Sequence, residues 1–473
     1  MEELTDPGNL LLEPGRIALV GFEFSGPDTC GGIGTALSAL ADVLRSAGHE
    51  VHLLYCPYNG PPTLWHGWDE YCQARKIALH YLPRRARYPL AWPSFRDFST
   101  AVADALQALD VDLIHTVDAD AYGAIAALRR AAGLGFAHTH ILTTMHGCMS
   151  WHRRGNGLQR TWDERENMEG LAHLLRHSDV VCYPSSYMRR WVDQNLSSVS
   201  GSPVVVPNCL PGVIRSAGIT SASRRDVNEI VFFGRLERRK GLGLFATTVR
   251  NLVANLGPRF TVTLLGKPGE GVGRRDLDAL FEGVGCEIRY LTNYRNLEAV
   301  TYLKTRACIA VVPSMQDNSP YTVYECLDAG IPLLTSAVGG IPELVHADDR
   351  HRTLLADRVT TLEEALARAL IEGIHPARLA FDPALADVEQ MAIHAKLVDR
   401  ARQSRAAGRP CTLLSPTSEA LARSEAAFLA HPSLLRRSAR FLGRIAYRVA
   451  GRASTLRGVA PLLTKLSRST DRK

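Results

Sequence analysis

Residues 307–312 (ACIAVV) are the feature that most constrains the fold of this 473-residue chain. The run is apolar without interruption and ends at Pro313, which is typical of a short strand buried on both faces of a parallel sheet. Strand and helix patterns alternate around it, from residue 16 to about 206 and again from residue 229 to about 380. The chain therefore predicts an α/β protein with two parallel-sheet units.

The segment after this strand predicts a helix whose start faces a crevice. Ser319 can serve as its N-cap with Pro320 at the first helical position, and Gly330 predicts its end. Asp317 lies in the loop and Glu325 lies one and a half turns into the helix. A helix start at this edge attracts anions, whereas two acids repel a bare phosphate and suit neutral hydroxyls beside it. The combination points to a sugar nucleotide, although two acids at this spacing also occur by chance.

A second candidate anion site lies upstream. Residues 230–236 (IVFFGRL) predict an apolar strand, and residues 237–242 (ERRKGL) lead into a helix. Arg235 and Lys240, five residues apart across this turn, can converge on one diphosphate, Arg through its bidentate fork and Lys as a point charge. Taken alone, the same residues could be a solvated run of charge.

A third motif lies near the N-terminus. Residues 16–21 predict a strand, residues 30–35 (CGGIGT) a glycine-rich loop, residues 36–47 a helix, and residues 49–55 a second strand. Glycines let the backbone approach a ligand, and the helix start adds positive potential. A nicotinamide fingerprint needs G-x-G-x-x-G directly after the strand, so a dehydrogenase is disfavoured.

Residues 317–345 (DNSPYTVYECLDAGIPLLTSAVGGIPELV) resemble the donor-site signature of the retaining GT-B glycosyltransferases, the large bacterial group with an E-x7-E motif (family 4-like). The first acid of the pattern is Asp317 here, where the family usually has Glu. The resemblance covers roughly residues 15–400. It implies the GT-B fold, in which two Rossmann-like, doubly wound parallel-sheet domains face a central cleft.

The resemblance also implies roles for individual residues. Arg235 and Lys240 would hold the donor diphosphate, Glu325 the ribose hydroxyls, and Asp317 and His146 the sugar hydroxyls. Asp317, His146, Arg235 and Lys240 are therefore the candidate catalytic residues. The further donor-binding candidates are Gly32, Ile33, Asn318, Ser319, Pro320, Tyr321 and Thr322.

Other residues near these motifs have less specific interpretations. Arg238 and Arg239 are expected to face solvent. His115, at the end of another predicted strand, is interpreted as a structural hydrogen-bonding residue. Residues 150–156 mix aromatic and basic groups and are interpreted as a loop that either contacts the acceptor or is merely solvated.

The predicted organisation has five parts. Residues 1–207 form the N-terminal Rossmann-like domain on the acceptor side, residues 208–228 a linker, and residues 229–385 the donor-side Rossmann-like domain. Residues 386–433 are expected to form helices that cross back to the first domain, with residues 388–402 as the main candidate. Residues 434–473 form a basic tail with eleven Lys and Arg residues against one acid.

The tail predicts an amphipathic helix suited to an anionic membrane surface. The alternatives are a helix docked on the protein or a disordered segment. Because the excess of basic residues is confined to the tail and no nucleic-acid motif accompanies it, no nucleic-acid partner is expected.

Composition argues against a membrane-spanning protein, a secreted protein and a cysteine-based metal or disulfide site. No apolar stretch reaches the roughly 18 residues needed to span a bilayer, and the acidic, polar N-terminus is unlike a secretion signal. We therefore expect a cytoplasmic protein, with the inner membrane face as a candidate site of peripheral binding. The ten cysteines form no metal-binding or disulfide pattern, so neither a zinc site nor a disulfide framework is expected. The roles that the resemblance implies for Arg235 and Lys240 would neutralise the leaving diphosphate without a bound cation, so no metal and no cofactor are expected.

These features together predict a retaining, metal-independent hexosyltransferase. It would transfer a sugar from a nucleoside diphosphate donor to a glycan or lipid-linked acceptor in polysaccharide or glycolipid synthesis. The alternatives are a sugar-nucleotide epimerase of the same architecture and a non-catalytic scaffold that binds sugar nucleotides.

Overall fold

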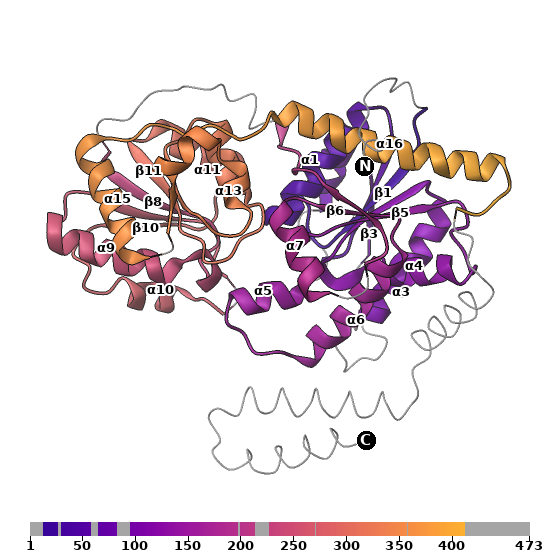
Figure 1. Cartoon of the computed structure of the whole chain (residues 1–473), viewed down its shortest axis with the longest axis horizontal. Helices are drawn as coiled ribbons and strands as arrows, with labels where there is room; N and C mark the ends of the chain where they lie inside the picture. The colour runs from indigo at the N-terminus through magenta and orange to yellow at the C-terminus, as the bar shows by residue number, and fades with distance from the viewer. Residues whose placement is uncertain are drawn as a thin grey trace, which may run out of the picture.

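The chain forms two separate sheets, one of seven and one of six strands within the described residues, each flanked by helices (Figure 1). The strands in both sheets are parallel, which confirms the predicted α/β architecture with two doubly wound domains. The computed structural model describes residues 13–26, 30–57, 65–82, 95–196, 199–212, 227–269, 271–356 and 358–411.

The first sheet has the order β3-β2-β1-β4-β5-β6-β7. Its central strand β1 is apolar and buried, with Ile17 opposite Val51 on one side and Leu113 on the other. Because the strand order reverses between β1 and β4, a crevice is expected at their carboxyl ends. The strands are β1 (Arg16–Gly21), β2 (Glu50–Tyr55), β3 (Ala78–Tyr81), β4 (Leu113–Val117), β5 (His140–Thr144), β6 (Val180–Tyr183) and β7 (Ser202–Val205).

The helices of this domain correct two predictions. Helix α1 begins at Gly32, so part of the predicted glycine loop is its first turn. Residues 150–156 were predicted as a loop, but all except Asn156 belong to helix α5. The helices are α1 (Gly32–Ser46), α2 (Trp65–Arg75), α3 (Phe95–Leu109), η2 (Ala119–Ala121), α4 (Ala124–Ala131), α5 (Met149–Gly155), α6 (Trp162–His177) and α7 (Ser186–Asn195).

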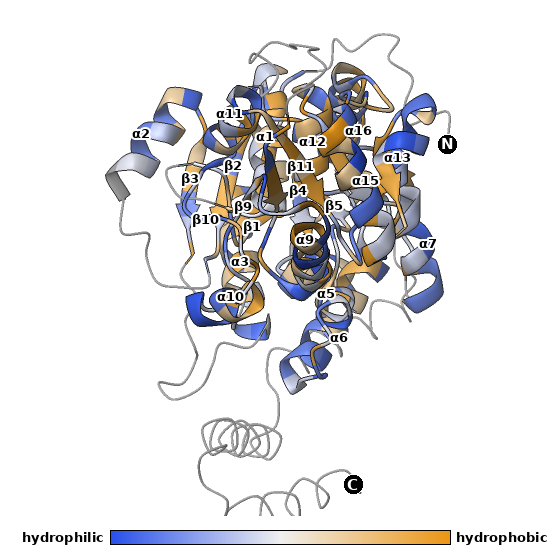
Figure 2. Ribbon diagram, turned by 90° about the vertical axis from the view of Figure 1, so that its left-hand side faces the viewer, coloured by the Kyte–Doolittle hydropathy of each residue, from blue (hydrophilic) through white to orange (hydrophobic). Residues whose placement is uncertain are grey.

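The second sheet has the order β10-β9-β8-β11-β12-β13, with its reversal between β8 and β11. Strand β11 is fully buried, as its apolar sequence predicts. Viewed from the side, hydrophobic residues concentrate on the strands and hydrophilic residues on the outer helices (Figure 2). The strands are β8 (Glu229–Phe233), β9 (Thr261–Leu265), β10 (Ile288–Leu291), β11 (Cys308–Val312), β12 (Leu333–Ser336) and β13 (Leu354–Leu355).

Helix α12 starts one position later than predicted. Pro320, in an extended conformation, is the N-cap, and the hydroxyl of Ser319 donates to Tyr324 Oη at 3.1 Å instead of capping the helix. Gly330 follows the helix with a φ of 62°, as predicted. The helices of this domain are η3 (Arg238–Lys240), α9 (Leu242–Leu256), α10 (Arg274–Leu280), α11 (Asn296–Thr305), α12 (Tyr321–Asp328), α13 (Ile341–Leu344), η4 (Ala347–Asp349), α14 (Arg350–Thr353) and α15 (Val359–Glu372).

Helix α16 (Pro383–Ala406) returns to the first domain and lies along it (Figure 1). Its Ile393 and Leu397 are buried in the core of the first sheet. His394 Nε2 lies 2.8 Å from His115 Nδ1, and His115 Nε2 lies 2.8 Å from Thr144 Oγ1. His115 therefore has the structural role predicted for it.

Part of the predicted organisation falls outside the described residues, namely residues 213–226 of the linker, residues 412–433 of the predicted crossing helices and the whole tail 434–473. Among the helices that the structure does describe, none is long and apolar enough to cross a membrane.

Candidate functional site at the domain junction

The candidate donor residues lie where the strand order of the second sheet reverses. Arg235 follows β8 and Asp317 follows β11, and these two strands are neighbours in the sheet. Loops at the end of the first sheet meet them there, since Arg235 Nη2 lies 3.9 Å from Glu23 Oε2 in the loop after β1. The site is therefore formed by both domains, at the edge where α/β sheets commonly bind ligands.

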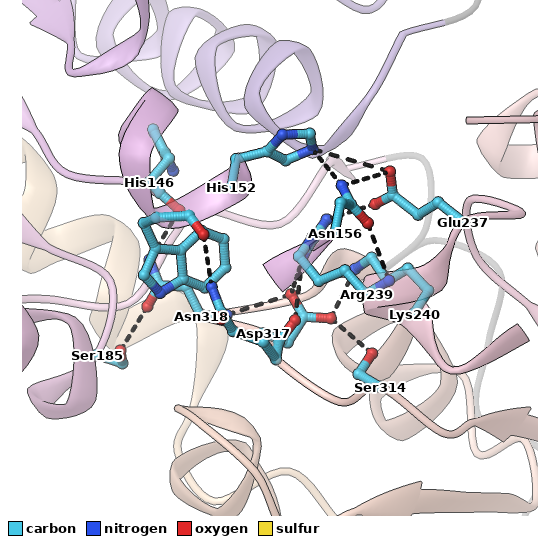
Figure 3. Close-up of polar contacts among 12 residues, drawn as sticks. His146, His152, Asn156, Ser185, Glu237, Arg239, Lys240, Ser314, Asp317 and Asn318 are labelled. Atoms are coloured by element: carbon cyan, nitrogen blue, oxygen red, sulfur yellow. Dashed lines mark hydrogen bonds and ion pairs between the residues drawn. The ribbon is translucent and has the colours of Figure 1, made fainter. Parts of the chain in front are cut away.

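Lys240 and Asp317 form a buried ion pair at this junction, with 2.6 Å between Nζ and Oδ2 (Figure 3). Ser314 Oγ also donates to Oδ2, at 2.8 Å. The other oxygen, Oδ1, accepts from Asn318 N at 3.2 Å and from Arg239 Nη1 at 3.4 Å. Because a carboxylate offers about four acceptor positions, those of Asp317 are all used by the protein.

Gly241 lets the turn carrying Lys240 approach strand β11 closely. Its φ is 79°, and a Cβ added there would lie 1.8 Å from the carbonyl oxygen of Pro313. A left-handed φ disfavours residues with a Cβ, and no flexible group could move aside to relieve this contact. The glycine in the ERRKGL segment thus brings Lys240 within reach of Asp317.

The charges of this pair depend on one another. Burial alone would raise the pKa of Asp317, but Lys240 and Arg239 outweigh that effect and hold the pKa below its usual value. Burial lowers the pKa of Lys240, while Asp317 opposes the shift. With all groups ionised, Lys240 and Arg239 face two anions, Asp317 and Glu237, so their charges are balanced within the protein. Arg235, beside them, is more exposed and has room for a ligand phosphate.

Arg239 does not face solvent as predicted. It is 7% exposed, and its guanidinium pairs with Glu237 at 2.8 Å and lies 5.3 Å from the ring of Trp151. In the 3-10 turn η3 the adjacent side chains of Arg238 and Arg239 point to opposite sides. Arg238 is exposed, as predicted, whereas Arg239 is buried. The sequence gives no sign of this difference, because the two arginines are adjacent and identical.

Glu325 is a second buried acid, in a less polar setting than Asp317. Burial raises its pKa to about 8, and a hydrogen bond from Asn296 Nδ2 to Oε1, at 3.1 Å, only partly opposes the shift. Asn296 Nδ2 also lies 3.1 Å from Thr35 Oγ1 in α1. Without a cation beside it, this carboxyl has capacity for a polar ligand.

The loop and first turn of α12 supply the other predicted donor-site residues. Asn318 donates through Nδ2 to the carbonyl of His146 at 3.1 Å, and its Oδ1 accepts from Ser185 Oγ at 2.5 Å. Tyr321 donates its hydroxyl to the carbonyl of Cys209 at 2.7 Å. Thr322 Oγ1 is buried without a hydrogen-bond partner in the described part of the chain, so it can bond to a ligand.

His146 is held through its backbone by a buried acid that sequence reasoning did not identify. Asp118, after β4, accepts from the backbone N–H groups of His146 at 3.1 Å and Gly147 at 2.9 Å. Burial raises the pKa of Asp118 to about 7 and lowers that of His146 to about 4. At neutral pH the His146 imidazole is therefore uncharged and can both donate and accept a hydrogen bond.

The start of α1 is already occupied by a carboxylate. Glu23 accepts from Gly31 N at 2.8 Å and from Gly34 N at 3.2 Å. Gly32 and Ile33 are the predicted donor-binding residues in this turn. Gly32 is exposed, and a Cβ added to it would lie 3.7 Å from the ring of Tyr321. Ile33 is half-buried. Glu23 thus takes the amides of Gly31 and Gly34, which flank the two predicted donor-binding residues.

Two family matches cover most of the chain. Residues 30–211 match Glycosyltransferase Family 4, and residues 220–381 match Glycosyl transferases group 1. The chain belongs to the family 4-like glycosyltransferases. Its sequence is 26% identical to a glycogen synthase of Mycobacterium tuberculosis over 345 residues, which cover 70% of this chain and 80% of the relative.

This glycosyltransferase is also 24% identical to a phosphatidyl-myo-inositol mannosyltransferase of Mycolicibacterium smegmatis over 358 residues, or 73% of this chain and 81% of the relative. Among solved structures, sucrose-phosphate synthase from Thermosynechococcus elongatus superposes with a TM-score of 0.54 at 18% identity, covering 83% of this chain and 98% of that one. The catalytic domain of starch synthase IV from Arabidopsis thaliana gives 0.54 at 14% identity, covering 83% and 100%. These likenesses confirm the GT-B fold.

Sequence reasoning gave no site role to several side chains that line this glycosyltransferase's junction, namely Glu23, Asp118, Ser185, Glu237 and Asn296. It placed Arg239 in solvent and considered Asn156 only within residues 150–156. Glu237 and Arg239 belong to the ERRKGL segment, whereas the others reach the site through tertiary packing that no spacing indicates. No group of three or more His, Cys, Asp and Glu side chains suited to a metal ion occurs in the described residues.

Proposed function

We propose that this glycosyltransferase is a retaining, metal-independent hexosyltransferase that uses a nucleoside diphosphate sugar. The observation that carries the proposal is the arrangement of charge at the junction. A cluster of three cations, Arg235, Arg239 and Lys240, lies in the same site as Glu325, a buried carboxyl with no cation beside it among the described residues. The first suits a diphosphate and the second suits the hydroxyls of a ribose.

In this proposal Arg235 and Lys240 stabilise the negative charge that grows on the leaving diphosphate. They do what a divalent cation would otherwise do, so the reaction needs no bound metal. The partly exposed Arg235 is free to turn toward the ligand, because its only ion pair in the described structure is the 3.9 Å contact with Glu23.

The remaining candidates have roles in positioning. Asp317 primarily holds Lys240, since its acceptor positions are all engaged, and a sugar hydroxyl would take the place of one of the longer bonds, such as that from Arg239. His146, as a neutral imidazole, would bond to the hydroxyls of the transferred sugar. The backbone and side chains of residues 318–322, including the unpartnered Thr322 hydroxyl, would bind the sugar or its phosphate. Gly32 and Ile33 would approach the same ligand from α1.

The acceptor is proposed to be a glycan or a lipid-linked glycan, in polysaccharide or glycolipid synthesis. One similar protein is a glycogen synthase, whose name indicates a glycan acceptor. Another is a phosphatidyl-myo-inositol mannosyltransferase, whose name indicates a lipid acceptor. A sugar-nucleotide epimerase or a non-catalytic scaffold are the alternatives, but the complete set of charged groups at the junction favours transfer.

A panel of sugar nucleotides tests the proposal. A donor at 100 times its dissociation constant should stabilise the protein by about 2.7 kcal/mol and raise its melting temperature. Incubating the stabilising donor, in the presence of a chelator, with glycan and glycolipid acceptors should give a product that keeps the donor's anomeric configuration by NMR. A product that is only an isomerised sugar nucleotide would indicate an epimerase, and binding without any product would indicate a scaffold.

A further inference from the structure

Helix α5 belongs to the first domain, yet its C-terminal end packs on the donor residues of the second. Gly155, the last residue of the helix, leaves no room for a side chain, since an added Cβ would lie 2.7 Å from Arg239 Cδ. Four residues earlier, one turn back along the helix, the carbonyl of Trp151 accepts a hydrogen bond from Gln316 Nε2 at 2.9 Å. The two domains therefore meet through close packing beside Asp317.

Asn156, the C-cap of α5, makes further polar contacts across this junction (Figure 3). Its Oδ1 accepts from the backbone N–H of Arg239 at 2.9 Å. Its Nδ2 donates to Glu237 Oε2 at 3.3 Å and lies at the same distance from His152 Nε2. Both the oxygen and the nitrogen of the Asn156 amide are thus bonded. Two of its partners, Glu237 and Arg239, belong to the turn that carries Lys240.

These contacts connect to the candidate catalytic pair. Glu237 holds the guanidinium of Arg239 at 2.8 Å, and Arg239 in turn contacts Asp317 Oδ1 at 3.4 Å and the carbonyl of Gln316 at 3.1 Å. Asp317 holds Lys240. All of these side chains are buried or half-buried, so few solvent molecules compete with the bonds between them.

We propose that Asn156 is a positioning residue for the transfer reaction: it anchors the Arg239 turn from the acceptor-side domain and thereby fixes the geometry of the Asp317–Lys240 pair. The inference rests on the proposed function. Its consequence is that the donor site reaches its working geometry only when the first domain is in contact with it. A displacement of about 1 Å in a catalytic group can cost a hundredfold in rate, so one amide can have a large effect.

The first test is Asn156→Ala, with Asn195→Ala as the matched control. Asn195 is also a helix-end asparagine of the first domain, but it is exposed and bonds to Trp191 and Arg154. Asn156→Ala should lower kcat by about 10- to 100-fold. The dissociation constant of the free nucleoside diphosphate should change by less than about threefold, because Arg235 and Lys240 remain. The control should change neither quantity.

A double-mutant cycle separates positioning from general damage. If Asn156 acts through the Asp317–Lys240 pair, then Asn156→Ala combined with Asp317→Asn should lose little more kcat than Asp317→Asn alone. A rescue adds independent evidence. Asn156→Asp places a carboxylate beside Glu237 and should be poorly active, whereas adding Glu237→Gln restores a donor and acceptor pair and should recover activity.

The outcomes distinguish this inference from the proposed function. If the unaltered enzyme transfers no sugar from any donor in the panel, the proposed function fails and the inference fails with it. If the enzyme is active but Asn156→Ala has full kcat, or if its loss multiplies with that of Asp317→Asn, the proposed function stands and the positioning role is wrong. Equal melting temperatures of the variants show that each loss is not due to unfolding.

Discussion

At the scale of single residues, burial decides what each charged group can do. Asp317 and Glu325 are both acids with exposed fractions of 5% or less, yet the first is held ionised by Lys240 and Arg239 and the second has its pKa raised to about 8. The same side-chain chemistry therefore yields a fixed anion in one place and a titratable group in the other. Among the charged groups of the site, Arg235 and Glu325 each give a prediction about the donor.

Arg235→Ala should lower turnover by about a hundredfold, on the order of 3 kcal/mol in transition-state stabilisation. The fold should be unaffected, because the 3.9 Å contact with Glu23 is partly exposed and such pairs contribute little. The measurement is steady-state turnover with the donor found in the panel. Arg238→Ala, an exposed arginine three residues away, is the control and should retain activity. Near-full activity of Arg235→Ala would remove this residue from the diphosphate site.

Glu325 should make nucleotide binding depend on pH. If the ribose hydroxyls bind the carboxylate, the affinity for the free nucleoside diphosphate should rise about fivefold from pH 7 to 8, because the pKa of Glu325 is about 8. The total rise should approach about tenfold as the profile levels off near pH 9. Working above pH 7 keeps the phosphates ionised, since their last pKa is about 6. Titration calorimetry measures the effect, and Glu325→Gln should bind more weakly at pH 8.5 and show no such rise. A flat profile for the unaltered protein would contradict the ribose role.

At the scale of elements, short turns position the residues of the site more than the helices do. The turn η3 ends at Gly241, and the turn before α13 contains Gly339, where an added Cβ would lie 1.7 Å from the carbonyl oxygen of Asp317. Both glycines have a left-handed φ and pack on the backbone of the loop after β11. The position of Asp317 is thus determined by two turns on either side of it.

Gly241→Ala should destabilise the protein and also reduce turnover, because its Cβ would meet the carbonyl of Pro313 and displace Lys240. The left-handed φ alone costs about 1 to 2 kcal/mol, and the contact adds to it. Urea denaturation and turnover are the measurements. Gly243→Ala is a matched control two residues later in α9, with nothing within 4 Å of its added Cβ, and it should be neutral or slightly stabilising. Equal behaviour of the two variants would show that the turn tolerates movement.

At the scale of the whole molecule, α16 ties the end of the chain back to the first domain. The helix packs on the core of the first sheet through apolar side chains, and its His394 meets His115 in a fully buried contact. Burial lowers the pKa of both histidines, that of His394 to about 4. Neither histidine can take a proton in this contact without loss of stability.

The free energy of unfolding should fall as the pH drops from about 6.5 toward 4, because the unfolded chain then binds protons that the buried pair does not. Each histidine can contribute up to about 1.4 kcal/mol per pH unit. Denaturant titrations at several pH values measure this slope. His394→Asn should reduce the slope, while His351→Asn, on an exposed residue of α14, should leave it unchanged. An identical slope in His394→Asn would show that this pair is not responsible.

The sequence alone determined the features that depend on local order along the chain. Apolar runs such as 307–312 predicted the buried parallel strands. The motifs after two of these strands predicted that Arg235 and Asp317 lie at the same sheet edge, since residues that follow neighbouring parallel strands reach one edge. The use of this edge as a sugar-nucleotide site stays a prediction. Tertiary structure alone decided which of two adjacent arginines is buried, that Asp317 is occupied by Lys240, and that Asn156 contacts the donor turn from 83 residues away. Those outcomes depend on how two domains pack together, and packing brings side chains into contact that no local pattern relates.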